Sequence, residues 1–365
     1  MKKRITFIAS TLVITAFVLT KLHTVTAYAV EGWMSEGGEW SYLNENDEPL
    51  QNTWRQARDS WFYLGDQGLM LRNCFIEQGN SLYYVFDDGA RAENTWVLVD
   101  EADGNGHEAG WYYFGGNGKA YRGTDSSFKR TVDGRRYIFD ESGLMLTGWF
   151  DEDGNPLGED DNPLEHGVYY ADEDGALKTE SWLDYSRLEL KGLEELSSDI
   201  SGRDYDDYDQ VWLYFNNQSR KVKSNGDRVI QRNIGGGTYG FDEYGIMLPW
   251  WTKVASVSNA DKSNPTSDIP TRFYAGYDGG SLQRNVWLWM YPSDNLIQDD
   301  FDDGEYSWWR TDQNGEVYQN KIKKVNGRYY AFDGLGRMQT GFVLFDNRST
   351  FVAQYDMDAW SSEDF

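Results

Sequence analysis

Cysteine and basic residues are scarce in this chain, and each shortage excludes a class of structure or partner. The 365 residues contain a single cysteine, Cys74, so no disulfide can form within one molecule. Stability must therefore come from packing or from a partner. Lys and Arg number 34 against 60 Asp and Glu, a balance that disfavours nucleic acid and anionic membrane surfaces as partners.

The residues of catalytic and metal sites are also scarce or badly spaced. After residue 29, His107 and His166 are the remaining histidines, without the spacing of a zinc site or a catalytic relay. We expect both to lie in surface loops. The acidic run at 151–161 lacks the spacing of a calcium-binding EF-hand and is typical of a solvated turn. The sequence therefore predicts no catalytic residue, metal or cofactor, and a protein that is not an enzyme.

A long apolar run occurs only at the N-terminus. Basic residues at positions 2–4 precede the apolar stretch Ile5–Leu19, and Ala27 and Ala29 fit a signal-peptidase site. The stretch is shorter than the ~20 residues that a membrane span needs. We predict that residues 1–29 are a secretory signal peptide and that no span remains after cleavage. Cleavage removes four positive charges from the net −26 and leaves a mature chain of −30.

Aromatic residues and glycine are abundant. The chain has 16 Trp, 25 Tyr and 18 Phe, and 38 Gly. Large apolar rings in this number argue against disorder, and they replace the Leu and Val that fill an α/β core. Frequent glycine suits many tight turns. The composition predicts many short strands.

One unit recurs along the chain. It consists of two or three aromatic residues, a polar segment that ends in Gly, an apolar pair, and Thr-Gly-Trp or a variant of it. About eleven copies begin at Trp40, Trp61, Tyr83, Trp111, Tyr137, Tyr169, Trp212, Tyr239, Phe273, Trp308 and Tyr329. Polar, mostly acidic insertions interrupt the period at 151–165, 184–210, 252–270 and 291–305. Within the second insertion, Leu188, Leu193 and Leu196 fit either a short helix or an irregular loop.

Each copy fits a β-hairpin. Alternating aromatics favour a strand, and a segment such as Asp140–Gly143 suits a turn in which Gly takes a positive φ. A single hairpin is marginal in water, so the aromatic faces must be buried against neighbouring hairpins. We predict an all-β fold: an elongated solenoid of stacked β-hairpins over residues 30–351, with irregular acidic insertions and an acidic C-terminal tail at 352–365.

The unit resembles the cell-wall-binding repeats known as choline-binding repeats, which also occur in glucan-binding proteins and in clostridial toxin repeat domains. The resemblance covers about residues 32–343 and rests on the recurring pattern Gly-Trp, Trp-Tyr-Tyr-Phe, Gly-x-Met and Thr-Gly-Trp. It implies shallow pockets between hairpins, in which aromatics and often a Met surround a choline headgroup. Electron-rich ring faces do attract a trimethylammonium group, which cannot donate a hydrogen bond.

The family pattern implies a set of ligand-binding residues. Trp33, Trp40 and Trp61 would line one pocket, and Trp54, Trp61 and Tyr83 a second, with Met70 beside it. Cys74 stands where a Trp is expected, which weakens the pocket there. Further candidates at the same positions of later repeats are Trp96, Trp111, Trp149, Trp182, Trp251 and Trp287.

Several alternatives stay open on the sequence alone. The inner rings of each triplet, such as Tyr63 and Tyr113, favour a place in the hairpin core, while the Gly-Trp tryptophans and Met70 fit core or ligand contact. The predicted function is a secreted protein, associated with the cell wall, that binds choline-bearing teichoic acid of a Gram-positive envelope. The alternative is an adhesin that stacks the same aromatics on a neutral glucan or host glycan. The insertions are short for a hidden hydrolase domain.

Overall fold

The computed structural model describes residues 31–123, 128–186, 210–225, 228–248, 280–292 and 298–346, and shorter pieces within 193–208 and at 251–253, 271–273 and 351–355. The predicted signal peptide and residues 356–365 of the predicted tail lie outside these residues. The chain forms two compact units. Unit 1 holds residues 31–95 and 114–119, and unit 2 holds residues 96–113 and the described residues from 120 onward.

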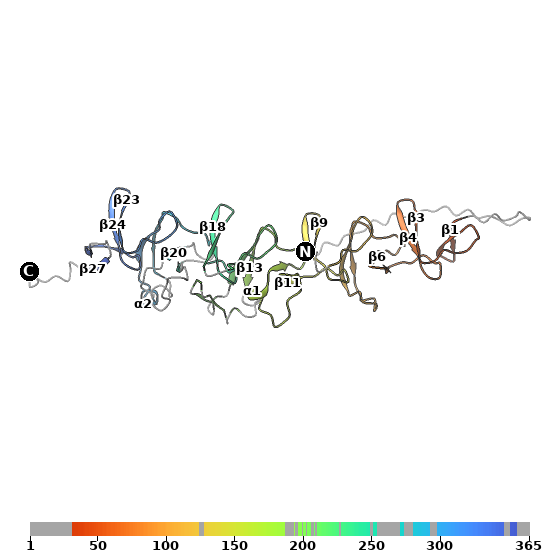
Figure 1. Ribbon diagram of the computed structural model, residues 1–365, viewed down its shortest axis with the longest axis horizontal. Helices are drawn as coiled ribbons and strands as arrows, with labels where there is room; N and C mark the ends of the chain where they lie inside the picture. Colours follow the sequence, from red (N-terminus) through yellow and green to blue (C-terminus); the bar gives the residue numbers. More distant parts are fainter. Residues whose placement is uncertain are drawn as a thin grey trace, which may run out of the picture. The chain divides into compact units, whose positions relative to one another are not determined.

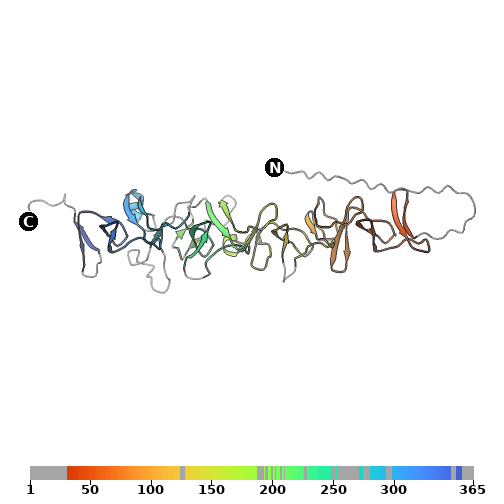
Figure 2. The same ribbon diagram turned by 90° about the horizontal axis from the view of Figure 1, so that it is seen from above.

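Antiparallel hairpins make up nearly all of the described structure, and Figures 1 and 2 draw them as separate narrow ribbons. The hairpins of unit 1 are β1–β2 (Gly32–Glu36, Glu39–Leu43), β3–β4 (Thr53–Ala57, Ser60–Leu64) and β5–β6 (Cys74–Gln78, Ser81–Val85). Hairpin β7–β8 (Thr95–Val99, Gly110–Phe114) lies in unit 2 except for its end residues Thr95 and Phe114.

Unit 2 continues the same pattern. Its other hairpins are β9–β10 (Lys129–Val132, Arg135–Ile138), β11–β12 (Gly148–Phe150, Tyr169–Ala171), β13–β16 (Ser181–Ser186, Gln210–Phe215), β14–β15 (Ser197–Ser198, Arg203–Asp204), β17–β18 (Ile230–Ile234, Gly237–Phe241), β19–β20 (Trp251–Lys253, Thr271–Phe273), β21–β22 (Trp287–Met290, Ser307–Arg310), β23–β24 (Lys321–Val325, Arg328–Phe332) with β25 (Met338–Gln339), and β26–β27 (Phe342–Phe345, Phe351–Tyr355). The helices are α1 (Pro163–His166) and α2 (Gln298–Asp302). Among the helices that the structure describes, none is long and apolar enough to cross a membrane.

The prediction of an all-β chain of hairpins is confirmed. Every aromatic residue that marks the start of a predicted copy lies on the second strand of a hairpin, from Trp40 on β2 to Tyr329 on β24. Within the described residues the largest sheet has three strands and no barrel closes. The last hairpin extends to Tyr355, so four residues of the predicted tail form part of a strand.

The tight turn of each hairpin lies between the two strands of the pair, not at the segment that the sequence indicated. Strands β9 and β10 turn at Asp133 and Gly134, which both have positive φ, as a type I′ hairpin turn requires. The segment Asp140–Gly143 comes after β10 and leads to a single bridge between Phe139 and Met145. The predicted positive φ of Gly143 is present, at 96°.

This second turn is held by the side chain of its first residue. The Asp140 Oδ1 accepts hydrogen bonds from the Leu144 N–H at 2.8 Å and the Ser142 hydroxyl at 2.7 Å. Asn216 and Asp312 accept the equivalent backbone bonds in later repeats. Such local bonds explain why Asp or Asn begins the turn. In the 151–161 run, Asp151 takes the same role, because its Oδ1 accepts from the N–H groups of Asp153 and Asn155.

In several repeats the residue at the bridge is hydrogen-bonded to the preceding hairpin. The Met70 N–H donates to the Trp40 carbonyl at 2.7 Å, while the next residue, Leu71, donates to Tyr63 in its own hairpin at 2.9 Å. Later repeats within unit 2 use the same pair of bonds, as in Met145 to Trp111. We call this place the bridge position. The backbone bond to the preceding hairpin fixes where the side chain of the bridge residue lies against that hairpin.

The insertions replace the tight turns of particular hairpins. Segments 151–165 and 291–305 lie between the strands of β11–β12 and β21–β22. The predicted bounds of the other two are too wide, because residues 184–186 belong to β13, residue 210 to β16 and residues 252–253 to β19. The described part of the second insertion packs into a core, in which Leu193 and Leu196 are buried with Tyr205. Leu193 and Leu196 are not in a helix, and Leu188 lies outside the described residues.

Candidate aromatic binding clusters

Four side chains meet at one place in several repeats. The first is a Trp on the first strand of a hairpin. The second lies on the other strand of that hairpin, two residues before the residue that pairs with the Trp. The third is an aromatic on the next hairpin, and the fourth is the bridge residue of that next hairpin. In the first repeat these are Trp33 on β1, Trp40 on β2, Phe62 on β4 and Met70. We name this set the Met70 cluster, and later sets by their bridge residue.

The Met70 cluster encloses a cavity of about 340 Å³. The Trp33 and Phe62 ring centroids lie 5.5 Å apart at 76°, an edge-to-face arrangement. Phe62 and Met70 are buried, whereas Trp33 and Trp40 are half-buried. The remaining lining residues are Ala57, Arg58, Arg72 and Asp88. The cavity therefore has an aromatic and thioether wall and a rim that carries charges of both signs.

The second cluster holds a cation of the chain itself. Trp54, Trp61 and Tyr83 occupy the three aromatic positions, and the bridge residue is Arg91. The Arg91 guanidinium carbon lies 5.2 Å from the Trp54 ring centroid, 5.4 Å from that of Trp61 and 5.8 Å from that of Tyr83. These distances are within the range of cation–π contacts. Its nitrogens also donate to Glu93 Oε1, at 3.0 and 2.6 Å.

Unit 2 contains more clusters with a Met at the bridge position. In the Met145 cluster the Trp96 ring lies 6.4 Å from Trp111 at 88° and 4.8 Å from Tyr137. In the Met338 cluster the corresponding distances from Trp287 are 6.2 Å to Trp308, again at 88°, and 4.8 Å to Tyr330. The outer rings are open to solvent, with Trp111 39% and Trp308 41% exposed. The Met247 cluster consists of Trp182, Trp212, Tyr239 and Met247.

The cluster at Trp149 differs at every other position. Val168, Leu213 and the bridge residue Lys221 replace Trp40, Phe62 and Met70. The Lys221 ammonium donates to the carbonyls of Pro163 at 3.2 Å and Leu164 at 2.6 Å in α1, and it lies 5.5 Å from the Trp149 ring. Burial holds the pKa of Lys221 well below its usual range. Trp149 thus packs in a core and not beside a cavity.

The predicted pockets are corrected by one residue each. The first was predicted to contain Trp61, but Phe62 lines the cavity and Trp61 belongs to the Arg91 cluster. Successive residues of a strand point to opposite faces, so Phe62 and Trp61 cannot face the same neighbour. The second pocket does bring Trp54, Trp61 and Tyr83 together. Met70 lies in the first, because its N–H is bonded to Trp40.

Four other residues singled out in the sequence are placed differently from the prediction or have side chains outside the described residues. Phe75, not Cys74, stands at the Trp position, since Phe75 pairs with Tyr84 as Trp54 pairs with Tyr63. The backbone of Trp251 forms part of β19, and its side chain lies outside the described residues. His107 lies in the loop between β7 and β8 but is buried, and its Nδ1 lies 2.7 Å from Asp103 Oδ2. His166 is exposed, and it ends helix α1 instead of lying in a loop.

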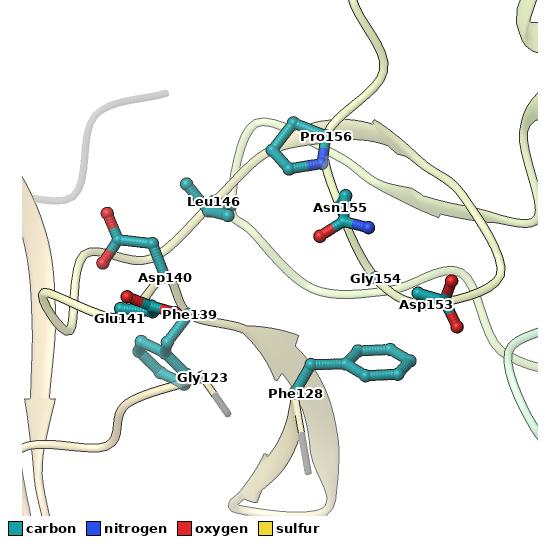
Figure 3. A pocket seen from close by; sticks show the side chains of 10 residues that line it. All are labelled: Gly123, Phe128, Phe139, Asp140, Glu141, Leu146, Asp153, Gly154, Asn155 and Pro156. Carbon is teal, nitrogen blue, oxygen red and sulfur yellow. The ribbon is translucent and has the colours of Figure 1, made fainter. Parts of the chain in front are cut away.

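A larger cavity in unit 2, of about 600 Å³, was not predicted. Figure 3 shows Phe128 and Phe139 on its wall, with Asp140 and Glu141 on one side and Asp153 on the other. It offers two rings where the Met70 cluster offers three and a Met. Its Asp140 is already engaged in the turn described above. The repeat pattern gave no signal for this cavity, because Phe128 precedes β9 outside any repeat position.

A buried carboxylate is the other unusual group. Burial raises the pKa of Asp242 to about 7, against a hydrogen bond from the Tyr205 hydroxyl that lowers it. Asp242 also accepts the N–H groups of Tyr244 and Ile246 as the first residue of a turn. Because the side chain is fully buried, it is part of the core formed with the second insertion. Among the described residues no group of three His, Cys, Asp or Glu could hold a metal.

Comparison with known proteins gave matches among solved structures only. No protein-family profile and no curated protein sequence matches the chain. The autolysin LytC of Streptococcus pneumoniae matches over 88% of this chain with 16% identity and a TM-score of 0.44, and the match spans 53% of LytC, about half its length. The choline-binding domain of CbpL from the same species matches over 70% of this chain and 100% of its own, with 20% identity and a TM-score of 0.40.

A shorter match is the choline-binding domain of Spr1274 from S. pneumoniae, which is 29% identical over 26% of this chain and 100% of that domain, with a TM-score of 0.21. These last two matches are both described as choline-binding domains, in agreement with the resemblance of the sequence to choline-binding repeats.

Proposed function

We propose that this chain is a secreted, non-catalytic protein that attaches to a Gram-positive cell envelope by binding choline-type quaternary ammonium groups in its aromatic clusters. The observation that carries the proposal is the Met70 cluster: three aromatic rings and a thioether around a cavity of about 340 Å³. A trimethylammonium group has no N–H to donate, so ring faces are its main source of attraction. Each ring contributes about 0.5–2 kcal/mol.

The Arg91 cluster supports a preference for cations. Three rings in the same repeat positions lie 5.2–5.8 Å from a guanidinium carbon. A geometry that accommodates one delocalised cation suits another of similar charge. The formal charge of −30 after signal cleavage adds a long-range attraction for cations, which a neutral glycan would not feel.

Several clusters on one chain would act together. We infer that the hairpins stack as a solenoid, because several bridge residues, such as Met70, Met145 and Met247, bond to the preceding hairpin. Weak sites on one chain then bind a polymer that carries many headgroups much more tightly than one site binds one headgroup. Choline-bearing teichoic acid is such a polymer, and attachment through it would be non-covalent.

Retention on a quaternary-amine resin tests the proposal, provided that charge is controlled. Because the chain is strongly acidic, it binds any cationic resin to some extent. We therefore expect choline chloride to elute the protein at a concentration where equal sodium chloride does not. The quadruple variant Trp33→Ala, Trp96→Ala, Trp182→Ala, Trp287→Ala, which removes one ring from each Met cluster, should elute equally with both salts.

Matched controls and a second ligand complete this test. Tyr329→Ala and Phe342→Ala remove exposed aromatics outside the clusters and should leave choline elution unchanged. Tryptophan fluorescence titrated with choline and with a soluble glucan separates the two ligand classes. A response to glucan alone would replace the proposal with a carbohydrate-binding adhesin.

A further inference from the structure

Met70 and Arg91 occupy the same place in two successive repeats. Each forms a single bridge to the end of the strand before it, Leu64 for Met70 and Val85 for Arg91. Each donates its N–H to the preceding hairpin, Met70 to Trp40 and Arg91 to Trp61. The backbone of the two clusters is therefore the same, and the difference between them lies in the side chains.

The Arg91 side chain is held on several sides. Three rings face its guanidinium, Glu93 pairs with it at 2.6 Å, and the side chain is 13% exposed. Gly118 covers its stem so closely that a Cβ there would lie 2.3 Å from Arg91 Nε. Gly89 covers Met70 in the same way, with 2.7 Å to its terminal methyl carbon. The Arg91 guanidinium thus occupies the place that the three rings surround.

We propose that Arg91 is a built-in ligand, which occupies the second cluster and closes it to external quaternary ammonium groups. This inference rests on the proposed function, because it concerns which clusters can take that ligand. The guanidinium lies among three rings and pairs with Glu93, so the cluster is filled by the chain itself. In these two repeats the residue at the bridge position then decides whether the cluster binds: Met70 leaves the first open, and Arg91 fills the second.

Exchange of the two side chains tests the inference. Indole N–H resonances of the full-length chain, assigned with single Trp→Phe variants, are followed by NMR during titration with choline. In the wild type we expect saturable shifts for Trp33 and Trp40 and none for Trp54 and Trp61. In Arg91→Met, the Trp54 and Trp61 resonances should shift with an affinity within about tenfold of that at Trp33.

The reverse change provides the matched variant. Met70→Arg places the same cation in the first cluster and should abolish the shifts of Trp33 and Trp40, while Met70→Leu should keep them. If Arg91→Met unfolds, as circular dichroism would reveal, Met70→Arg alone decides the question. Unchanged shifts of Trp33 and Trp40 in Met70→Arg would then overturn the inference.

The outcomes also separate this inference from the proposed function. Choline shifts at Trp54 and Trp61 of the wild type would show that Arg91 does not close the cluster, while leaving the function intact. A folded Arg91→Met variant whose Trp54 and Trp61 do not respond overturns the inference whatever the wild type does. A wild type without any response, together with a responding Arg91→Met, would refute the function and keep the inference.

Discussion

The Met70 and Lys221 clusters have the same backbone arrangement, but the first surrounds a cavity and the second is part of a core. In both, the bridge residue donates its N–H to the preceding hairpin, Met70 to Trp40 and Lys221 to Val168. The Met70 cluster keeps three rings around a cavity. In the Lys221 cluster, Leu213 is fully buried in a core and the ammonium is bonded to carbonyls of α1. A hairpin repeat thus provides four positions, and their side chains determine whether they form a binding site or a core.

The insertions explain why the two regions diverge. Unit 1 has short turns, such as Gly37–Gly38 between β1 and β2, which leave the cluster beside them uncovered. In unit 2, segments 151–165 and 184–210 replace the turns of two successive hairpins. They bring Leu164, Leu193 and Tyr205 over Trp149 and Leu213. The same tryptophan position is then covered by the chain itself.

The largest effect on stability should come from a mutation that creates a cavity in the core around Trp149 and Leu213, which we call the covered region. Leu213→Ala removes a fully buried side chain, which costs about 2–5 kcal/mol in a packed core. Urea denaturation should show this loss in the free energy of unfolding, while choline binding at Trp33 is unchanged in conditions where both proteins are folded. A loss below 1 kcal/mol would show that the residues around Trp149 do not form a tight core.

The covered region should also respond to pH. In the folded chain the pKa of Asp242 is about 7, against 3.8 for a free carboxyl, so the folded state binds the proton more tightly than the unfolded state. Its contribution to stability is complete below pH 4 and is lost as the pH rises through 7. Glu243 and Lys221 are the charged groups that act on it.

Asp242→Asn isolates this contribution. The difference in unfolding free energy between wild type and variant should change by roughly 1–4 kcal/mol between pH 4 and 8, with the wild type losing relative stability as pH rises. Choline binding at the Met70 cluster should not follow the same pH dependence. A constant difference across this range would mean that Asp242 is ionised in the folded chain at acidic pH.

In the Met70 cluster, removal of a wall should affect binding more than stability. Trp33→Ala removes one half-buried ring and should weaken choline binding at this cluster by about 2- to 30-fold, the equivalent of one cation–π contact of 0.5–2 kcal/mol. Indole resonances of Trp40 report the affinity. A variant that loses stability but keeps its affinity would assign Trp33 to the core.

The charged rim should have the smallest effect. Arg58 and Asp88 both line the cavity, so Arg58→Gln should raise and Asp88→Asn should lower choline affinity. Because the rim is open to solvent, each change should stay within about threefold and shrink in high salt. If Arg58→Gln lowered and Asp88→Asn raised the affinity for choline, the charges of the rim would not act on the bound cation as we expect.

Sequence patterns predicted the hairpins well because their causes are local. Alternating aromatics and turn glycines repeat within each copy. The register pairs Trp33 with Tyr42 and Trp54 with Tyr63, so Trp40 and Trp61 lie two residues away from those partners on the same face. The choice between Trp61 and Phe62 could not be made in this way, since it depends on which face of β4 meets the preceding hairpin.

Two further features were missed for different reasons. Arg91 could have been found, because Gly89-Ala90-Arg91 aligns with Gly68-Leu69-Met70, and a cation at a Met position is visible in that alignment. The same alignment gives Phe75 its place instead of Cys74. The core around Leu193 could not be found, because the spacing of these leucines fits a short helix as well as a loop, and Leu193 and Leu196 pack through long-range contacts.

A crystal structure of the full chain at saturating choline would decide whether the aromatic clusters are binding sites. We expect a quaternary ammonium group against the rings of the Met70 cluster and of the Met145, Met247 and Met338 clusters. The Arg91 and Lys221 clusters should hold only their own side chains. Empty Met clusters, with choline bound elsewhere or nowhere, would contradict the proposed function and assign these tryptophans to the core.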